Sequence, residues 1–235
     1  MILLLFVLGL IIGSFLGALS YRLPRNMSIS KGRSICPNCK HQIAWFDNIP
    51  LLSYVILLGK CRNCHKKISW REPAIELATG ITFAFVGLNP IALIIASILI
   101  AIFVIDLEHQ IIPDELVFLG LGVFAIYNIL YTTYYPPFLP GFISALLLLS
   151  LNLLTKGKGM GLGDVKLALL LGAIAGQNFL IWLFFSFASG AVVGVLLIIF
   201  GKAGLKQKIA FGPFLIIGLV LSAFFAPAFL RLTGF

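Results

Sequence analysis

Long apolar runs occupy most of this chain, and they limit what it can fold into. Of its 235 residues, 60% are hydrophobic and only 11% are charged, whereas a soluble domain carries about 25% charged residues. The mean hydropathy is +1.10. A soluble core cannot enclose that much apolar surface, so we expect the folded chain to be solvated by lipid.

The apolar runs predict about eight membrane-spanning helices, because a helix needs roughly 20 mainly apolar residues to cross a bilayer. The expected spans are residues 2–20, 73–88, 90–105, 115–132, 138–154, 164–176, 178–200 and 212–231. No basic segment precedes the first run and no small-residue cleavage site follows it, so we interpret it as a retained helix and not a signal peptide. The predicted fold class is all-α, a polytopic membrane helix bundle.

The positive charges predict how this bundle is oriented. Ten of the 17 Lys and Arg lie within 22–71, three lie at 156–166 and three at 202–208. With eight spans, all of these fall on one face, and only Arg231 is left over. Because Lys and Arg gather on cytoplasmic loops, we expect 21–72 in the cytoplasm and both termini outside. The net charge of +9 then reflects topology, and no nucleic-acid partner is needed to explain it.

Three parts of the chain follow from this topology. Residues 1–20 form a first transmembrane helix, 21–72 form a polar cytoplasmic loop domain, and 73–235 form a core of seven membrane helices. Only the loop domain is polar and long enough to fold by itself.

All four cysteines lie in the loop domain, as two C-x-x-C pairs. They are Cys36 with Cys39 and Cys61 with Cys64, and 21 residues separate the pairs. Such pairs suit a tetrahedral zinc site, and a metal would supply much of the folding energy of so small a loop. Four thiolates fill the coordination shell, so this zinc would be structural. Four free or redox-active thiols are the alternative, and the adjacent His41 and His65 are more often surface residues than ligands.

Carboxylates are concentrated at two places on the expected cytoplasmic face. Asp106, Glu108, Asp114 and Glu115 lie between the third and fourth spans, and Asp164 follows Gly161 and Gly163 at the start of the sixth. Carboxylates near hydrocarbon are costly and therefore suggest function. Two that face each other in a low-dielectric pocket cannot both ionise easily, so the pair holds one proton. Such a pair can activate water for peptide hydrolysis.

Simpler interpretations of these residues remain open. Asp164 could be an ordinary helix cap, and Asp106 could be solvated at the membrane interface. The other acidic side chains are more often solvated loop charges, and His109 is ambiguous. A membrane transporter that uses the acidic pair for proton or ion passage is a further alternative, although no inverted repeat is visible.

At these motifs the chain resembles the bacterial type IV prepilin peptidases, a family of G-x-G-D membrane aspartyl proteases. The resemblance covers nearly the whole chain. It rests on Gly32-Arg33-Ser34 with the cysteine pairs, Asn48-Ile49-Pro50 and Gly59-Lys60, on Pro73–Gly80, on Ile105-Asp106 to Pro113-Asp114, on Gly161–Lys166, and on Phe211-Gly212-Pro213-Phe214. A lone G-x-G-D is weak evidence, whereas five motifs in order are strong.

The resemblance implies specific roles. Asp106 and Asp164 would be the catalytic pair, and the substrates would be precursors of type IV pilins and of the pseudopilins of type II secretion or DNA uptake. Cleavage would take place at the cytoplasmic face of the bacterial inner membrane. The leaders are basic, so Glu108, Asp114 or Glu115 would recognise them. A membrane aspartyl protease that processes lipoprotein precursors is a rival, but such proteins resemble four-span chains without a cysteine loop.

Many members of this family also methylate the new N-terminal amine with S-adenosylmethionine, so the resemblance implies that activity too. Gly59, Lys60 and Glu76 are weak candidates for the methyl-donor site. Glu76 could equally form a charge pair with Arg71 at the membrane edge, and Gly59-Lys60 could be a plain turn. The sequence does not indicate an oligomeric state.

Overall fold

The computed structural model describes residues 1–28, 34–131, 138–157, 159–201 and 209–233. Several residues that entered the sequence predictions lie outside these ranges: Lys31, Gly32, Arg33, Lys158, Lys202, Lys206 and Lys208. The stretch 133–137, between the fourth and fifth expected spans, also lies outside them.

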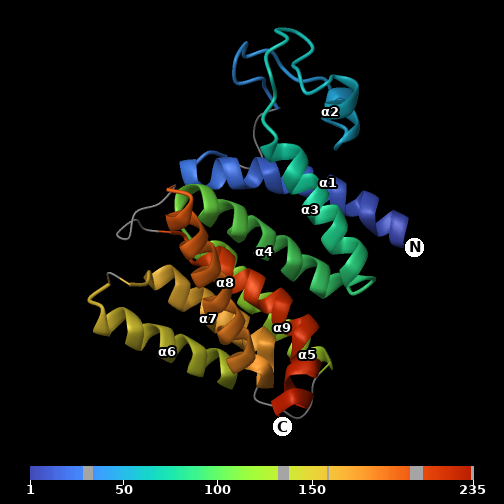
Figure 1. Ribbon diagram of the computed structural model, residues 1–235. Coiled ribbons are helices and arrows are strands. Elements are labelled where there is room, and N and C mark those ends of the chain that lie inside the picture. The colour runs from blue at the N-terminus through green and yellow to red at the C-terminus, as the bar shows by residue number, and fades with distance from the viewer. Residues whose placement is uncertain (29–33, 132–137, 158, 202–208, 234–235) are drawn as a thin grey trace. The chain divides into compact units, whose positions relative to one another are not determined.

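Helices are the regular secondary structure of the described residues, and turns and irregular segments join them, which confirms the all-α class (Figure 1). They contain no strand, only two isolated bridges, Ile35–Gln42 and Lys60–Lys67. The α-helices are α1 (Ile2–Arg22), α2 (Leu52–Ile56), α3 (Arg71–Val86), α4 (Pro90–His109), α5 (Asp114–Tyr131), α6 (Leu139–Leu154), α7 (Leu162–Ala175), α8 (Phe179–Ile199) and α9 (Gly212–Thr233). Three 3-10 turns accompany them: η1 (Leu23–Arg25), η2 (Trp45–Asn48) and η3 (Gly176–Asn178).

The eight long helices lie on the eight predicted runs. By length and hydropathy, three described segments can cross a membrane: Ile2–Arg25, Pro90–His109 and Leu162–Ile199, the last of which contains both α7 and α8. Leu139–Leu154 and Gly212–Phe225 are shorter apolar helices. Membrane character is therefore shown, and the number of eight spans stays a prediction.

Local sequence explains where these helices end. Gly87 adopts φ 78° directly after α3, a conformation that glycine reaches without steric cost. Asn89 Oδ1 accepts a hydrogen bond from the Ala92 amide at 3.1 Å, and Pro90 is the first residue of α4, where a missing N–H costs nothing.

The chain divides into two compact units, Met1–Val104 and Ile105–Phe235.

In the first unit, α1 packs closely against α3 through small residues (Figure 1). Gly9 and Gly13 lie one turn apart on α1, and a Cβ on either would come within 2.7 Å of the α3 backbone, at Gly80 and Glu76 respectively. Gly17 continues the row. Small residues at every fourth position allow helices in a membrane to approach, and this pattern was not among the features predicted from the sequence.

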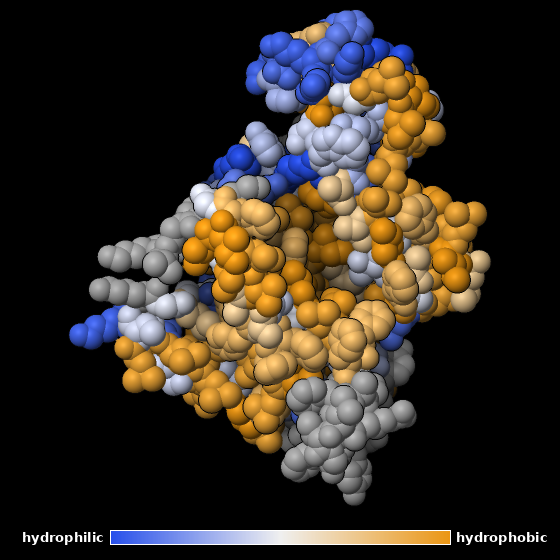
Figure 2. Space-filling model, in the orientation of Figure 1, coloured by the Kyte–Doolittle hydropathy of each residue, from blue (hydrophilic) through white to orange (hydrophobic). Residues whose placement is uncertain are grey.

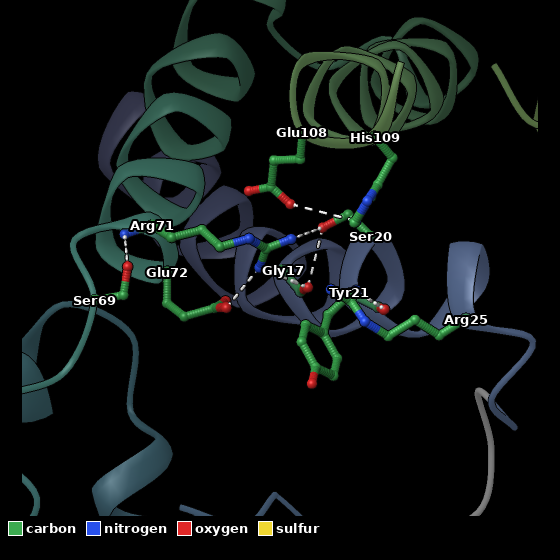
Figure 3. A network of polar contacts seen from close by, with 9 residues as sticks. All are labelled: Gly17, Ser20, Tyr21, Arg25, Ser69, Arg71, Glu72, Glu108 and His109. Carbon is green, nitrogen blue, oxygen red and sulfur yellow. Dashed lines mark hydrogen bonds and ion pairs between the residues drawn. The ribbon is translucent and has the colours of Figure 1, made fainter. Parts of the chain in front are cut away.

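A polar cluster closes the loop end of the α1–α3 pair (Figure 3). The Arg71 guanidinium donates to the Gly17 carbonyl at 3.1 Å, to Ser20 Oγ at 2.8 Å and to Glu72 Oε1 at 2.6 Å. A charge near hydrocarbon must be paired, and here Arg71 is paired with its sequence neighbour Glu72 while it bridges to α1.

In the second unit, α7 is the central helix and packs against α5, α6, α8 and α9. Beyond its exposed first turn, α7 is mostly enclosed; Leu167, Ala168, Leu170 and Leu171 are each 0% exposed. The α6–α7 contact is so close that a Cβ on Gly172 would lie 2.6 Å from Ser144 Oγ. Burial on every side explains why α7 is apolar without a preferred face. The same packing holds α7 in place, and the first turn of α7 carries Asp164.

Candidate active site and metal centre

Asp106 lies in the last turn of α4 and is only 4% exposed. Its Oδ2 accepts a hydrogen bond from the backbone N–H of Gly212 at 3.0 Å. Gly212 is the first residue of α9, and the first amides of a helix have no partner inside the helix. The helix start therefore supplies the donor that holds this carboxylate.

Asp164 lies in the first turn of α7 and is 7% exposed. Its Oδ2 accepts a hydrogen bond from the Gly161 amide at 3.0 Å. A carboxylate at this position that binds the amide at the helix start stabilises the helix end. The capping role considered above is therefore real, and Asp164 fulfils it with a buried side chain rather than a solvated one.

The two carboxylate motifs meet within the second unit. The segments that carry Asp106 and Asp164 come together around Ile112, although 57 residues separate the two carboxylates along the chain. Ile112 lies between the two motifs: a Cβ on Gly163 would be 3.1 Å from Ile112 Cβ, and one on Gly212 would be 3.2 Å from Ile112 Cδ1. A Cβ on Gly212 would also lie 2.6 Å from Asp106 Oδ2. Two glycines thus let three segments converge around one isoleucine.

The other acidic residues of this region are more exposed, and two of them, Asp114 and Glu108, lie beside a basic side chain. Lys166 Nζ donates to both oxygens of Asp114, at 2.8 and 2.7 Å, and both side chains are about half exposed. His109 Nε2 lies 4.0 Å from Glu108 Oε2. The Asp114–Lys166 pair connects the start of α5 to α7 and so links the two motifs a second time.

The four cysteine sulfurs gather at one point in the first unit, and all lie within 4.8 Å of one another. Cys36 Sγ and Cys64 Sγ are 3.9 Å apart. Ligands at a Zn–S distance of about 2.3 Å in a tetrahedron are about 3.8 Å apart, so the sulfur spacing fits a zinc ion. Cys36, Cys39, Cys61 and Cys64 could hold the metal that the sequence predicted.

The two cysteine pairs have the same backbone structure. The Cys36 amide donates to the His41 carbonyl and the Lys40 amide to the Cys36 carbonyl, both at 2.9 Å. The second pair repeats both bonds 25 residues later, with Cys61, Lys66 and His65. Backbone amides of Cys39 and Asn38 lower the pKa of the Cys36 thiol to about 6, whereas burial and the neighbouring cysteines raise the pKa of Cys64 to about 11. Without a metal the four sulfurs therefore do not all ionise together, and a thiolate is the form that binds metal.

An ion pair links η2 to the second cysteine pair. The Arg62 guanidinium donates to both oxygens of Asp47, at 2.8 and 2.6 Å. These hydrogen bonds from Arg62 hold the pKa of Asp47 below its ordinary value. The pair closes the loop between the two sulfur-bearing turns.

The candidate residues for a methyl donor have structural roles of their own. Gly59 has φ 67°, and a Cβ there would lie 2.9 Å from Tyr54 Oη, which accounts for a glycine at this turn. Glu76 is 8% exposed and its Oε2 accepts a hydrogen bond from the Leu51 amide at 2.9 Å. Lys60 pairs with Lys67 in a bridge. Each of these residues therefore has a structural explanation, and their part in binding a methyl donor stays a prediction.

The convergence at Ile112 was not predicted. Gly212 belongs to a segment that carries the resemblance, but its hydrogen bond to Asp106 joins residues that are 106 positions apart in the sequence. Ile112 lies within the first catalytic motif of the resemblance, but nothing in the sequence indicated that it would lie between Gly163 and Gly212.

Comparisons with known proteins agree with the sequence motifs. Residues 7–89 match the model of the bacterial peptidase A24 N-terminal domain, and residues 93–199 match that of the type IV leader peptidase family. No solved structure matched significantly.

Three curated relatives share the name prepilin leader peptidase/N-methyltransferase. The Myxococcus xanthus protein is 35% identical over 87% of this chain and 65% of its own length. The Bacillus subtilis protein is 32% identical over 94% and 93%, and the Pseudomonas aeruginosa protein is 33% identical over 90% and 86%. The chain therefore spans just under two thirds of the M. xanthus relative and most of the other two.

Proposed function

The chain belongs to the type IV leader peptidase family, and from that premise we propose that it is an aspartyl endopeptidase that removes the leaders of type IV prepilins and pseudopilins. The observation that carries the proposal is the convergence of the segments of two buried carboxylates, Asp106 and Asp164, which are far apart in the sequence. Asp106 and Asp164 form the proposed catalytic pair. The relatives' names, all of which include prepilin leader peptidase, support the substrate class.

Each carboxylate is oriented by one backbone amide, and this suggests how the pair acts. The Gly212 and Gly161 amides bind Oδ2 of Asp106 and Asp164 respectively. We assign the other oxygen of each carboxylate to the catalytic water and the scissile carbonyl. The ionised member takes a proton from water as the water oxygen attacks the carbonyl carbon. The protonated member donates to the carbonyl oxygen, and a proton then goes to the leaving amine.

The membrane topology forms part of the proposal. Eight spans place the basic loop domain at 21–72 on the cytoplasmic face of the bacterial inner membrane and both termini outside. Residues 1–20 and 73–235 are then the membrane part. A prepilin leader is cytoplasmic while the helix that follows it lies in the bilayer, so cleavage at this face is expected. Leader recognition by Glu108, Asp114 or Glu115 belongs to the same proposal.

Zinc in the cysteine cluster and methyl transfer complete the proposed function. Zinc bound by Cys36, Cys39, Cys61 and Cys64 would cross-link the loop domain and stabilise its fold. N-methylation of the new N-terminal residue, with S-adenosylmethionine as donor, is supported by the second half of the relatives' name. No residue is assigned to that reaction.

Mass spectrometry of a purified prepilin incubated with the full-length protein tests both activities. We expect one cut before the apolar helix, and an additional methyl group only when S-adenosylmethionine is present. Asp106→Asn and Asp164→Asn should each reduce cleavage about 10²–10⁴-fold, whereas Asp47→Asn, the same change in the loop, should not. Cleavage that survives both substitutions would contradict the proposed mechanism.

A further inference from the structure

The loop domain exposes a group of large apolar side chains. They belong to α2, to η2 and to the residues that precede α3, and each is more than half exposed: Trp45, Leu52, Val55, Ile56, Leu58 and Trp70. A folded domain rarely leaves so many large apolar residues in water without an interaction partner.

The apolar side chains of α2 share one side of the helix. Leu52, Val55 and Ile56 have the i, i+3, i+4 spacing of a single face, while Ser53 points to the opposite side and is buried. Ser53 Oγ lies 3.0 Å from the Phe46 carbonyl and 2.8 Å from the Ile49 carbonyl. This contact fixes η2 against α2, so the exposed face belongs to an ordered surface.

A buried carboxylate places this face at the level of the membrane helices. The Leu51 amide, one residue before α2, donates to Glu76 Oε2 at 2.9 Å. Glu76 lies five residues after Arg71, the start of α3, which is about 7 Å along a helix axis. The loop therefore folds back to the second turn of α3. In the proposed topology α3 enters the membrane at this end, which puts α2 at the depth of the lipid headgroups.

The backbone around α2 supports the same placement. Leu51 has φ 57° and ψ −47°, a strained conformation for a residue with a Cβ. The hydrogen bond to Glu76 holds it there. At the other end of the segment, the Tyr54 and Trp70 rings pack with centroids 5.2 Å apart, and Trp70 directly precedes α3. The segment is thus fixed to α3 at both ends.

The charges of the loop match an anionic lipid surface. Residues 34–72 carry six basic side chains (Lys40, Lys60, Arg62, Lys66, Lys67 and Arg71) and two acidic ones (Asp47 and Glu72). Tryptophan beside lysine and arginine is typical of the membrane–water interface, and basic residues near the surface are attracted to anionic headgroups. Figure 2 shows the apolar surface of the loop at α2 continuing over α3, with the polar surface at the far tip.

We propose that α2, with Trp45, Leu58 and Trp70, is an interfacial anchor that inserts into the lipid leaflet on its own side of the membrane and holds the metal loop against anionic headgroups. Glu76 is the positioning residue that sets its depth. The proposal depends on the proposed membrane topology but not on the catalytic roles, and the occupant of the apolar face is lipid and not a protein.

Tryptophan fluorescence of the full-length protein in nanodiscs tests this anchor. The chain has three tryptophans, and Trp182 is buried in the second unit. The emission that is lost in Trp45→Phe or in Trp70→Phe is therefore the emission of that one loop tryptophan. Lipids brominated near the glycerol end of the acyl chains should quench roughly half or more of the Trp45 and Trp70 emission. Aqueous acrylamide should quench it weakly, and anionic lipid should strengthen both effects.

A matched pair of substitutions provides the control. Val55→Glu adds one negative charge to the anchor and should make both tryptophans accessible to acrylamide. Gln42→Glu adds the same charge at another exposed position of the loop and should change nothing. Zinc content measured in both variants excludes simple unfolding. Strong acrylamide quenching with no effect of brominated lipid would overturn the proposal and leave the face available to a protein. Prepilin cleavage in the same nanodiscs reports the proposed function separately.

Discussion

The carboxylate of Asp106 accepts a hydrogen bond from the backbone amide of Gly212, 3.0 Å away and 106 residues further along the chain. This bond fixes the last turn of α4 to the first residue of α9. It explains why glycine stands at 212, since any side chain would enter the space of the carboxylate. The bond also yields the most direct test of the proposed site.

Gly212→Ala should reduce prepilin cleavage about 10²-fold, because its Cβ would lie 2.6 Å from Asp106 Oδ2 and a displacement of about 1 Å at a catalytic group costs that much. Gly122→Ala in α5 is the control, since no atom lies within 4 Å of its Cβ. Initial rates with a synthetic prepilin measure both. Equal cleavage rates for the two variants would show that activity does not depend on the position of the Asp106 carboxylate beside Gly212.

Gly163→Ala should have a smaller effect, about ten-fold on the cleavage rate. Its Cβ would lie 3.1 Å from Ile112 Cβ, a contact that a shift of a few tenths of an ångström relieves. The loss should appear in kcat more than in KM, because the change affects the distance between the carboxylates and not the leader. A loss confined to KM would instead place Gly163 in substrate binding.

Glu115→Gln should raise the KM for a basic leader more than Asp114→Asn does. The Asp114 charge is already neutralised by Lys166 at 2.7 Å, whereas Glu115 is exposed. An exposed ion pair contributes only about 0–1 kcal/mol, so neither variant should unfold the protein. Steady-state kinetics with leaders of different charge measure the difference. If charge reversal at 108, 114 and 115 together leaves KM unchanged, acidic leader recognition is wrong.

The cysteine cluster should bind one zinc ion per chain. Cys64→Ser should lower the zinc content and the thermal stability of the loop domain, because a structural zinc site supplies folding energy directly. Metal analysis of the purified protein and thermal unfolding with and without a chelator provide the measurement. Zinc content that is the same in the wild type and the variant would contradict the assignment of Cys64 as a ligand.

Glu76→Ala should loosen the segment from Leu51 to Leu58, whereas Glu76→Gln should retain it. A glutamine oxygen can still accept the Leu51 amide, and loss of a partner for a buried amide costs about 1–3 kcal/mol. Hydrogen exchange of the α2 amides in the full-length protein distinguishes the two variants. Equal protection in both would show that another contact sets the position of the loop.

The composition of the sequence and the order of its motifs determined the helix positions, the sulfur cluster and the family. Its apolar runs predicted where the eight long helices lie, since burial in lipid requires continuous apolar helices. The C-x-x-C spacing predicted a cluster of four sulfurs, because each pair forms the same local turn around its first cysteine. The motifs around Asp106 and Asp164 predicted the family, which the comparisons show.

Only the tertiary structure decided how these pieces meet. The bond from Gly212 to Asp106, the place of Ile112 between two glycines and the bond from Leu51 to Glu76 all join residues remote in sequence. No local pattern encodes them, because an apolar chain in lipid leaves the choice of neighbouring helix to small residues and a few polar contacts. The order of apolar residues determines which helices form, and close packing around glycine and buried carboxylates determines which of their atoms touch.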